Sequence, residues 1–257
     1  MIQINPSFFI ESAFLPVRLL TLISYYRQQG RIALRIVLRI GGSVVASPID
    51  TELMGKYVDL AIKLREQGHE LVVVTGGGSL AREFITIARN LGLNMQAQDE
   101  IAISVSRLFA QLFVKKLDYL SCSQVSSTLE DAAKCLNEGK IVVMGGLKPG
   151  ITTDAVAALV AEHVNADLVV KGTDQDGVFS KDPRKNSDAV KLDRLSFSDL
   201  GRVLSESKHK AGIHQIIDPE AVKILNRGHM KLSVVNGFKP ENILSVLKGE
   251  SIGTTIS

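Results

Sequence analysis

Apolar and polar positions follow two different periods along this chain, and the pattern becomes regular from Leu34 onward. Short apolar runs rich in β-branched residues predict buried strands, whereas apolar residues three or four positions apart predict helices. The predicted strands cover residues 35–40, 70–75, 141–144 and 167–171. The predicted helices cover residues 51–67, 80–91, 99–116, 129–137 and 153–164. Because the strands are apolar almost throughout, we expect helices to cover both faces of their sheet.

Strands and helices alternate along the sequence, and a glycine cluster follows three of the strands. The clusters are Gly41-Gly42, Gly76-Gly77-Gly78 and Gly145-Gly146. This order predicts an α/β fold, a three-layer α/β/α sandwich with a mainly parallel central sheet. Ligands of such sheets bind beyond the carboxyl ends of the strands, which is where these glycines fall. No repeat or change of composition follows residue 34, so we expect residues 34–257 to form a single domain.

The glycine clusters suit phosphate binding, because their backbone N–H groups are exposed and no Cβ keeps a phosphate away. A glycine loop alone is more often an ordinary turn. Three such loops on one sheet, with cations at two strand ends, favour the phosphate interpretation. The sequence has no P-loop motif, no G-x-S-x-G hydrolase elbow, and no G-x-G-x-x-G that opens a helix after the first strand. We therefore expect phosphoryl transfer on a different α/β scaffold.

Composition and charge narrow the class of protein further. The 257 residues are 45% hydrophobic and 22% charged, which excludes a disordered chain. The formal net charge is only +3, from 30 basic and 27 acidic residues, so we expect no nucleic-acid partner. Residues 1–33 hold Arg18, Arg27 and Arg31 against Glu11, and therefore carry +2 of this charge. The rest of the chain is close to neutral.

Residues 1–33 form an apolar segment ahead of the regular pattern. Glu11, Pro16 and Arg18 interrupt it too early for a transmembrane span, and it lacks the basic start and cleavage site of a signal peptide. We expect an appended or wrongly annotated start that lies outside the domain. An organelle transit sequence, and a short amphipathic helix packed on the core or on a neighbouring subunit, are the alternatives. We expect no membrane partner and a cytoplasmic protein.

The sequence offers few residues for redox or metal chemistry. Its two cysteines, Cys122 and Cys135, cannot build a disulfide framework or a closed zinc site, so we expect two reduced thiols in a cytoplasmic protein. The five histidines are scattered and show no metal-binding spacing. We therefore expect no metal ligand among the side chains.

Several longer motifs accompany the glycine clusters. They are Ile40-Gly41-Gly42-Ser43, Gly76-Gly77-Gly78 with Ala81-Arg82, Gly145-Gly146 through Pro149-Gly150, Thr152-Thr153-Asp154-Ala155-Val156-Ala157-Ala158, TDQDGVFSKDP over 173–183, Ala211-Gly212, Ile217-Asp218-Pro219 and Gly253-Thr254-Thr255-Ile256. With these motifs the chain resembles the amino-acid kinase superfamily and, within it, the uridylate kinases of the archaeal type. The resemblance runs from Leu34 to Ser257 and does not include residues 1–33.

The resemblance implies an enzyme that transfers the γ-phosphoryl group of ATP to UMP, giving UDP and ADP, in pyrimidine nucleotide (CTP) biosynthesis. ATP would be the phosphoryl donor and would arrive with Mg²⁺ held mainly by phosphates and water. UMP would bind in the N-terminal lobe of the domain and ATP in the C-terminal lobe. The resemblance also implies a homohexamer. Because the UMP phosphate needs no strong general base, catalysis would rest on positioning and charge neutralisation.

The resemblance implies catalytic roles for four residues, Arg39, Arg82, Asp154 and Lys171. Lys171 would neutralise charge on the transferring group, Asp154 would orient the basic residues, and Arg82 would reach a phosphate at the glycine loop. Arg39 departs from the pattern, because most of the superfamily has lysine there, and a planar guanidinium is not a point charge. From the residues alone, a solvated helix face for Arg82 and a helix cap for Asp154 are the simpler interpretations.

Binding residues are implied by the same resemblance. At the ATP site they are Gly41, Gly42, Ser43, Gly78, Arg82, Thr173, Asp174, Phe179 and Asp182. At the UMP site they are Gly77, Asp99, Leu147, Lys148, Pro149, Gly150, Ile151, Thr152 and Thr153. Phe179 would lie by the adenosine and Asp99 would accept ribose hydroxyls, while Arg107 would lie near the UMP phosphate or a subunit contact. The simpler interpretations are a place in the core for Phe179 and a helix N-cap for Asp99.

Two other functions remain open on the sequence. A different kinase of the superfamily would act on a carboxylate or on isopentenyl phosphate, but Asp99 and the loop 147–153 match a nucleoside-monophosphate site instead. A storage or regulatory protein on the same fold, such as the molybdenum-storage proteins, would bind nucleotides without transferring a phosphoryl group. The intact glycine loop over 76–78 argues against such a protein, whereas Arg39 leaves room for it.

Overall fold

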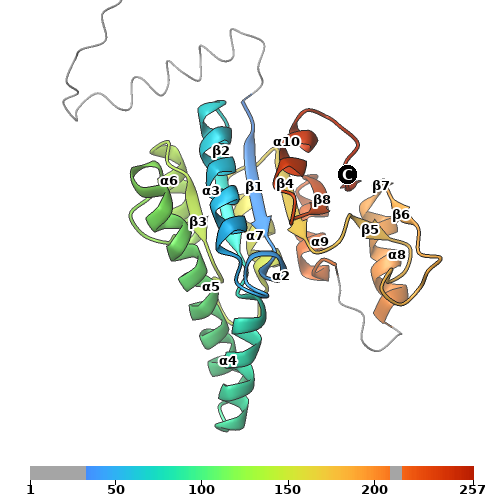
Figure 1. Ribbon diagram of the computed structural model, residues 1–257, viewed down its shortest axis with the longest axis horizontal. Coiled ribbons are helices and arrows are strands. Elements are labelled where there is room, and N and C mark those ends of the chain that lie inside the picture. The colour runs from blue at the N-terminus through green and yellow to red at the C-terminus, as the bar shows by residue number, and fades with distance from the viewer. Residues whose placement is uncertain (1–32, 209–215) are drawn as a thin grey trace, which may run out of the picture.

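The structure is a computed structural model that describes residues 33–208 and 216–257, and Figure 1 shows its fold. Its strands are β1 (Arg35–Ile40), β2 (Glu70–Thr75), β3 (Val142–Met144), β4 (Leu168–Thr173), β5 (Val178–Phe179), β6 (Lys191–Leu192), β7 (Arg194–Leu195), β8 (Lys231–Asn236) and β9 (Thr254–Ile256). Its helices are α2 (Gly42–Val45), α3 (Thr51–Glu66), α4 (Gly78–Asn90), α5 (Met95–Leu117), the 3₁₀-helix η1 (Asp118–Leu120), α6 (Leu129–Asn137), α7 (Thr153–His163), α8 (Phe197–Lys208), α9 (Pro219–Arg227) and α10 (Glu241–Leu247).

A seven-stranded sheet in the order β3-β2-β1-β4-β8-β9-β7 runs through the middle of the molecule. β1 pairs in parallel with β2 and with β4, and β4 pairs in parallel with β8. β9 is antiparallel to β8. β5, which lies within the TDQDGVFSKDP motif, forms a separate antiparallel pair with β6. The predicted α/β fold with a mainly parallel central sheet is confirmed.

Helices cover both faces of this sheet. Successive side chains of each strand point to opposite faces, and the side chains on both faces are apolar. On β1, Ile36, Leu38 and Ile40 pack into a core shared with α3, α5 and α10. Val37 packs into a second core shared with α6, α7 and α9. The three layers of the predicted sandwich follow from this alternation. Arg39 falls on the same face of β1 as Val37, which is the face that α7 covers.

The helix α5 begins earlier than the periodicity predicts. It starts at Met95 rather than at Asp99, because the Asn94 side chain accepts a hydrogen bond from the Ala97 N–H at 2.9 Å and caps the helix. Asp99 is therefore not an N-cap and lies in the second turn of α5.

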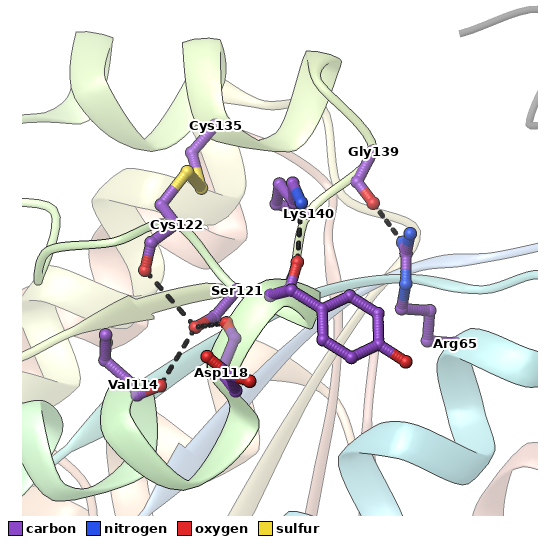
Figure 2. Close-up of a disulfide and its surroundings, with 9 residues drawn as sticks. Arg65, Val114, Asp118, Ser121, Cys122, Cys135, Gly139 and Lys140 are labelled. Atoms are coloured by element: carbon purple, nitrogen blue, oxygen red, sulfur yellow. Dashed lines mark hydrogen bonds between the residues drawn. A yellow bond between two sulfur atoms is a disulfide. The ribbon is translucent and has the colours of Figure 1, made fainter. Parts of the chain in front are cut away.

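Cys122 and Cys135 form a disulfide, so the expectation of two reduced thiols is wrong (Figure 2). Cys122 lies in the loop after η1 and Cys135 lies on α6. Packing of α6 beside this loop brings the two Cα atoms to 6.1 Å, a distance that a disulfide spans. Figure 2 shows that the loop is also held by α5, because the Ser121 hydroxyl lies 3.2 Å from the Val114 carbonyl oxygen. Tertiary packing therefore makes a pair that composition alone does not reveal.

Residues 1–32 and 209–215 lie outside the described part of the chain. The expectations for the N-terminal segment and for the Ala211-Gly212 motif therefore lie outside it as well. Among the helices within the described ranges, none combines the length and the apolar composition that a membrane span needs. All the predicted catalytic and binding residues lie within these ranges.

Candidate functional site

The carboxyl ends of β1, β2 and β4 open into a cavity of about 710 Å³. The structure brings eleven of the predicted site residues together in its lining. These are Arg39, Gly42, Ser43, Gly77, Gly78, Arg82, Thr153, Asp154, Lys171, Thr173 and Asp174. With Arg184, the lining holds four cationic and two anionic side chains, a formal charge of +2. A positive cavity with glycine backbone at its edge suits an anionic ligand such as a polyphosphate.

Arg39 and Lys171 lie side by side because β1 and β4 are parallel neighbours in which these residues are paired in register. Both side chains reach the carboxylate of Asp154, which comes from the first turn of α7. Lys171 Nζ lies 2.5 Å from Asp154 Oδ2, and Arg39 Nε lies 2.7 Å from Asp154 Oδ1. The Lys171 contact is an aligned hydrogen bond, whereas the Arg39 Nε–H is not aligned with its oxygen. We call these three side chains the charge cluster.

The start of α7 positions the anion of the charge cluster. Thr152 is the N-cap, and its hydroxyl oxygen accepts the Ala155 N–H at 3.2 Å. Asp154 is therefore not the cap and lies in the first turn, where the helix dipole stabilises a negative charge. Thr153 holds the neighbouring cation, because its hydroxyl oxygen accepts a hydrogen bond from Arg39 Nη2 at 2.9 Å. One helix start thus holds both Asp154 and the guanidinium of Arg39.

Burial and the charge of the opposite partner shift the pKa values of Lys171 and Asp154 in opposite directions. Burial lowers the pKa of Lys171 to about 8, although the Asp154 carboxylate opposes this shift. Burial alone would raise the pKa of Asp154, but the Arg39 and Lys171 charges outweigh it and lower that pKa to about 2. Asp154 is therefore ionised at neutral pH, and Lys171 loses its charge not far above neutrality.

The first two glycine clusters touch each other through their backbones. A Cβ on Gly42 would collide with the backbone of Gly78. Gly78 has a φ of +59°, and a Cβ there would lie 2.5 Å from the carbonyl oxygens of Gly42 and Ala46. Both positions therefore require glycine. Gly41 does not line the cavity, and its N–H donates to the Gly172 carbonyl oxygen at 2.9 Å. The close approach of Gly42 and Gly78 brings the N-terminus of α4 next to the end of β1, where this N-terminus can face an anion.

The residues predicted at the ATP site fall into two places. Thr173 and Asp174 line the cavity at the end of β4. Asp174 Oδ2 lies 2.5 Å from Arg184 Nη2, so the cavity contains a cation that was not among the predicted site residues. Phe179 and Asp182 lie outside the lining, in the segment that includes β5. Asp182 Oδ1 accepts the backbone N–H of Arg184 at 3.0 Å and so holds the backbone at this position.

Phe238 places an aromatic ring at the cavity, in the turn after β8. The residue is 48% exposed, which is high for a phenylalanine. Two hydrogen bonds anchor the backbone that leads into it, because the Phe238 N–H donates to Asn236 Oδ1 at 2.9 Å and the Gly237 N–H donates to the Thr173 carbonyl oxygen at 2.7 Å. An exposed ring on an anchored backbone at this edge suits stacking on a base. The resemblance had pointed to Phe179 for that role.

The loop between β3 and α7 holds most of the residues predicted to bind UMP. Leu147, Lys148, Pro149, Gly150, Ile151 and Thr152 lie in this loop, outside the cavity lining. α5 holds the loop at two points. Asp99 Oδ2 accepts the Gly150 N–H at 2.8 Å. Arg107 donates to the carbonyl oxygens of Gly146 at 2.9 Å and Leu147 at 3.0 Å. The structure thus brings Asp99 to this loop across 51 positions of sequence.

Six further lining residues were not predicted as site residues: Ser47, Gly76, Gln175, Arg184, Ile216 and Phe238. Gly76 belongs to one of the predicted glycine clusters. Gln175 and Arg184 lie within or directly after the TDQDGVFSKDP motif, so polar residues near that motif were a usable signal. Ser47, Ile216 and Phe238 come from separate loops, and only tertiary structure brings them to the cavity.

Comparison with known proteins places the chain among kinases. Residues 34–236 match the amino acid kinase family. The chain is 44% identical to a uridylate kinase of Methanocaldococcus jannaschii over 225 residues, which cover 87% of this chain and 99% of that protein. It is 40% identical to a uridylate kinase of Methanococcoides burtonii over 85% of this chain and 93% of that protein.

Solved structures agree with these sequence matches. The crystal structure of uridylate kinase from Archaeoglobus fulgidus superposes with a TM-score of 0.79 at 38% identity, and the match covers 87% of this chain and 100% of that chain. A UMP kinase from Bacillus anthracis shares the fold with a TM-score of 0.74 at 20% identity, over 88% of this chain and 97% of that chain.

Proposed function

Because this chain belongs to the amino acid kinase family and, within it, to the uridylate kinases, we propose that it transfers the γ-phosphoryl group of ATP to UMP. A bond forms between a phosphate oxygen of UMP and the γ-phosphorus, and the bond from that phosphorus to the β–γ bridging oxygen breaks. The products are UDP and ADP. The observation that carries the proposal is the charge cluster of Arg39, Asp154 and Lys171 in a positive cavity lined by glycine loops.

The charge cluster would stabilise the negative charge that moves during transfer. Lys171 and Arg39 are two cations in register on neighbouring strands, and their side chains are only 8% and 14% exposed. Their charges are therefore screened less than those of surface residues. Asp154 would hold both cations in place rather than take a proton, because its pKa lies near 2. The nucleophile is an anionic phosphate, so the reaction needs no strong base.

Binding roles are part of the same proposal. For ATP we assign Gly41, Gly42, Ser43, Gly78, Arg82, Thr173, Asp174, Phe179 and Asp182, to which the cavity adds Arg184 and Phe238. For UMP we assign Gly77, Asp99 and the loop from Leu147 to Thr153. Asp99 would act on UMP with the carboxylate oxygen that does not hold Gly150, since Oδ2 already accepts the Gly150 N–H.

The lining fits ATP as the phosphoryl donor, because a formal charge of +2 and glycine N–H groups complement a triphosphate. Mg²⁺ would enter with ATP and neutralise part of the phosphate charge. Within residues 33–208 and 216–257, no group of three or more histidine, cysteine, aspartate or glutamate side chains is arranged for a metal ion.

The proposal extends to the setting in which the enzyme works. UMP phosphorylation would serve pyrimidine nucleotide (CTP) biosynthesis in the cytoplasm. Residues 34–257 would form one domain with UMP in its N-terminal lobe and ATP in its C-terminal lobe, and six chains would assemble into a homohexamer. Detection in the cytoplasmic fraction of the source cells and light scattering of the purified protein test the location and the assembly.

An ADP-release assay on the full chain tests the activity. UMP, CMP, dUMP, isopentenyl phosphate, acetylglutamate and aspartate are compared as acceptors, with Lys171→Met as the inactive control. We expect UMP to give the highest kcat/KM and Lys171→Met to lose most of the turnover. Turnover with another acceptor but not with UMP would identify a different kinase of the fold. Binding of both nucleotides without ADP release would identify a non-catalytic protein, and either result contradicts the proposal.

A further inference from the structure

Asp218 lies where two helices on one face of the sheet begin side by side. It is the N-cap of α9, and its Oδ1 accepts the Glu220 N–H at 2.9 Å. α9 packs against α7 in the same core. Asp218 is 66 positions from Thr152 and 64 positions from Asp154 along the chain. Tertiary packing alone therefore brings Asp218 to the start of α7.

Asp218 makes two contacts with the start of α7. Its Oδ2 accepts a hydrogen bond from the Thr152 hydroxyl at 2.5 Å. Its backbone N–H donates to Asp154 Oδ2 at 3.2 Å. The same Asp154 oxygen accepts from Lys171 Nζ at 2.5 Å. One residue thus touches both the cap of α7 and the anion of the charge cluster.

These contacts commit the Thr152 hydroxyl to the protein. It donates its single hydrogen to Asp218 and accepts the Ala155 N–H at 3.2 Å. In this arrangement the hydroxyl has no hydrogen left to donate to a ligand. The side chain of Thr152 therefore links α7 to Asp218, and a ligand at this loop would meet the backbone or the remaining lone pair.

We propose that Asp218 is a positioning residue that holds the first turn of α7, and through it the Asp154 carboxylate, against Lys171. The inference rests on the proposed function, because it concerns the side chains assigned to phosphoryl transfer. Asp218 does not line the cavity, so it acts through Asp154 and not on a ligand. Its role is distinct from simple helix capping, because a cap needs only the contact with Glu220.

The charge of Asp218 also reaches Lys171. The charged groups that face Lys171 are Asp154 from α7, Arg39 from β1 and Asp218 from the start of α9. Burial has the largest effect and lowers the pKa of Lys171, Arg39 lowers it too, and the two carboxylates raise it. Neutralising Asp218 therefore favours the uncharged amine and lowers the pKa of Lys171.

Two variants separate the charge of Asp218 from its hydrogen bonds. Asp218→Asn removes the charge but can keep both contacts, because its one oxygen accepts the Glu220 N–H and its NH2 group can donate to the remaining lone pair of the Thr152 hydroxyl. Asp218→Ala removes the charge, the cap and the contact with Thr152. Asp50→Ala is the matched control, because Asp50 is also an aspartate N-cap and its Oδ1 accepts the Leu53 N–H at 2.9 Å at the start of α3.

Each protein is measured as the full chain in two ways. The first is kcat and KM for UMP and ATP as a function of pH. The second is the titration of the Lys171 amine, followed by NMR on protein labelled with ¹³C at the lysine Cε and assigned with Lys171→Met. The NMR measurement needs no turnover, so it remains informative whatever the acceptor of the reaction is.

We expect Asp218→Ala to lower kcat about tenfold, because a small displacement of a charge at a reacting centre is costly. KM for ATP should stay within about twofold, since the hydrogen bonds of Asp218 go to Thr152, Asp154 and Glu220, none of which is assigned to ATP. Asp218→Asn should keep most of its kcat near neutral pH, while the alkaline limb of kcat and the Lys171 titration both move to lower pH. Asp50→Ala should lose stability but change neither property.

The proposal is overturned if Asp218→Asn leaves the Lys171 titration unchanged and Asp218→Ala has the kcat of Asp50→Ala. If Asp218→Ala does not fold, Asp218→Asn decides alone, because a shifted titration supports the proposal and an unshifted one overturns it. A wild-type protein that releases no ADP with UMP would refute the proposed function instead. The NMR titration would still decide whether Asp218 positions the charge cluster.

Discussion

Arg39 and Lys171 meet the same carboxylate in different ways, although they are paired in register. Lys171 directs its ammonium at one oxygen of Asp154. Arg39 spreads its guanidinium over two partners, with Nε 2.7 Å from Asp154 Oδ1 and Nη2 donating to the Thr153 hydroxyl at 2.9 Å. A lysine ammonium is a single point charge and cannot bridge both partners in this way. Arginine at this position therefore ties the cation to the start of α7.

Replacing Arg39 with methionine should lower kcat about 100-fold, the range for losing one charged donor at a reacting centre. Arg39→Lys should lose about tenfold, because the charge stays while the Thr153 contact is lost. Steady-state kinetics at saturating ATP and UMP measure both. Arg35→Met is the control, since Arg35 lies on the same strand but pairs with Glu70 at 2.6 Å, outside the cavity. An Arg39→Met variant with wild-type kcat would exclude Arg39 from catalysis.

Lys171 should give activity and stability opposite responses to alkaline pH. Its pKa in the folded protein is lowered by burial from the ordinary 10.5 to about 8, so kcat should fall as the ammonium loses its proton through pH 8. Between these two values the unfolded chain binds more protons at Lys171 than the folded chain does. The free energy of unfolding contributed by Lys171 therefore rises with pH from about 8 to 10.5. Below pH 8 the buried ammonium destabilises the folded protein by its full amount.

Two measurements check this pair of trends. A kcat–pH profile reports the activity, and urea denaturation over the same pH range reports the free energy of unfolding. Lys171→Met provides the reference, because it removes the titrating group. The free energy of unfolding of the wild type minus that of the variant should increase across the window. A constant difference in the free energy of unfolding, or a kcat that does not fall through pH 8, would show that Lys171 titrates in a different pH range.

Sequence motifs were enough to single out Arg39, Asp154 and Lys171, because each lies in or beside a motif of the family, and the structure brings the three together. Their catalytic roles stay predictions. Phe238 could not be found in the same way, because it reaches the cavity only when the turn after β8 is pinned to Thr173. Contacts made across the fold leave no local pattern.

Among the elements, strand and helix alternation was readable as far as β4 because these strands are buried on both faces and the helices between them have one apolar side. The elements after β4 were not predicted, although β8 is buried over four consecutive residues and α9 has one apolar side. β5, β6 and β7 are each only two residues long, which is too short for any period to show. The Cys122–Cys135 disulfide escaped prediction for the same reason as Phe238, since only packing of α6 brings the cysteines together.

The disulfide should stabilise the region between η1 and α6 shown in Figure 2. It closes a sequence separation of 13 positions, for which loop-closure entropy gives about 3 kcal/mol in the free energy of unfolding. Urea denaturation at fixed protein concentration, with and without reductant, measures this contribution. A Cys122→Ser/Cys135→Ser variant should have the free energy of unfolding of the reduced protein, and reductant should not change that value. Two titratable thiols in protein denatured without reductant would show that the bond does not form.

At the scale of the whole molecule, the hairpin of α4 and α5 extends beyond the end of the sheet (Figure 1). Of the eleven exposed large hydrophobic residues in the described ranges, seven lie on this hairpin. They are Phe84, Ile87, Leu91, Leu93, Met95, Leu108 and Leu112. Phe84 and Ile87 on α4 and Leu91 at its C-cap are three and four positions apart and therefore lie on one side of the helix. Apolar side chains gathered in this way are typical of a surface that contacts another protein.

We therefore expect the α4–α5 hairpin to lie in contacts between subunits. Light scattering after size exclusion should give the wild type a mass six times that of the 27.9 kDa chain. Ile87→Glu should give a smaller assembly, because a carboxylate in an apolar contact loses its hydration without gaining a partner. Dissociation should also raise KM for UMP, since Asp99 and Arg107 on α5 hold the loop between β3 and α7.

Val190→Glu provides the matched control for this change. Val190 is 63% exposed and lies just before β6, away from the hairpin, so a glutamate there should leave the mass unchanged. A wild type that runs as a single 27.9 kDa chain would contradict the assembly itself. An Ile87→Glu variant with the mass of the wild type would show instead that subunits meet elsewhere. The exposed apolar face of α4 would then be expected to contact a different protein, because burial of apolar side chains in an interface is favourable.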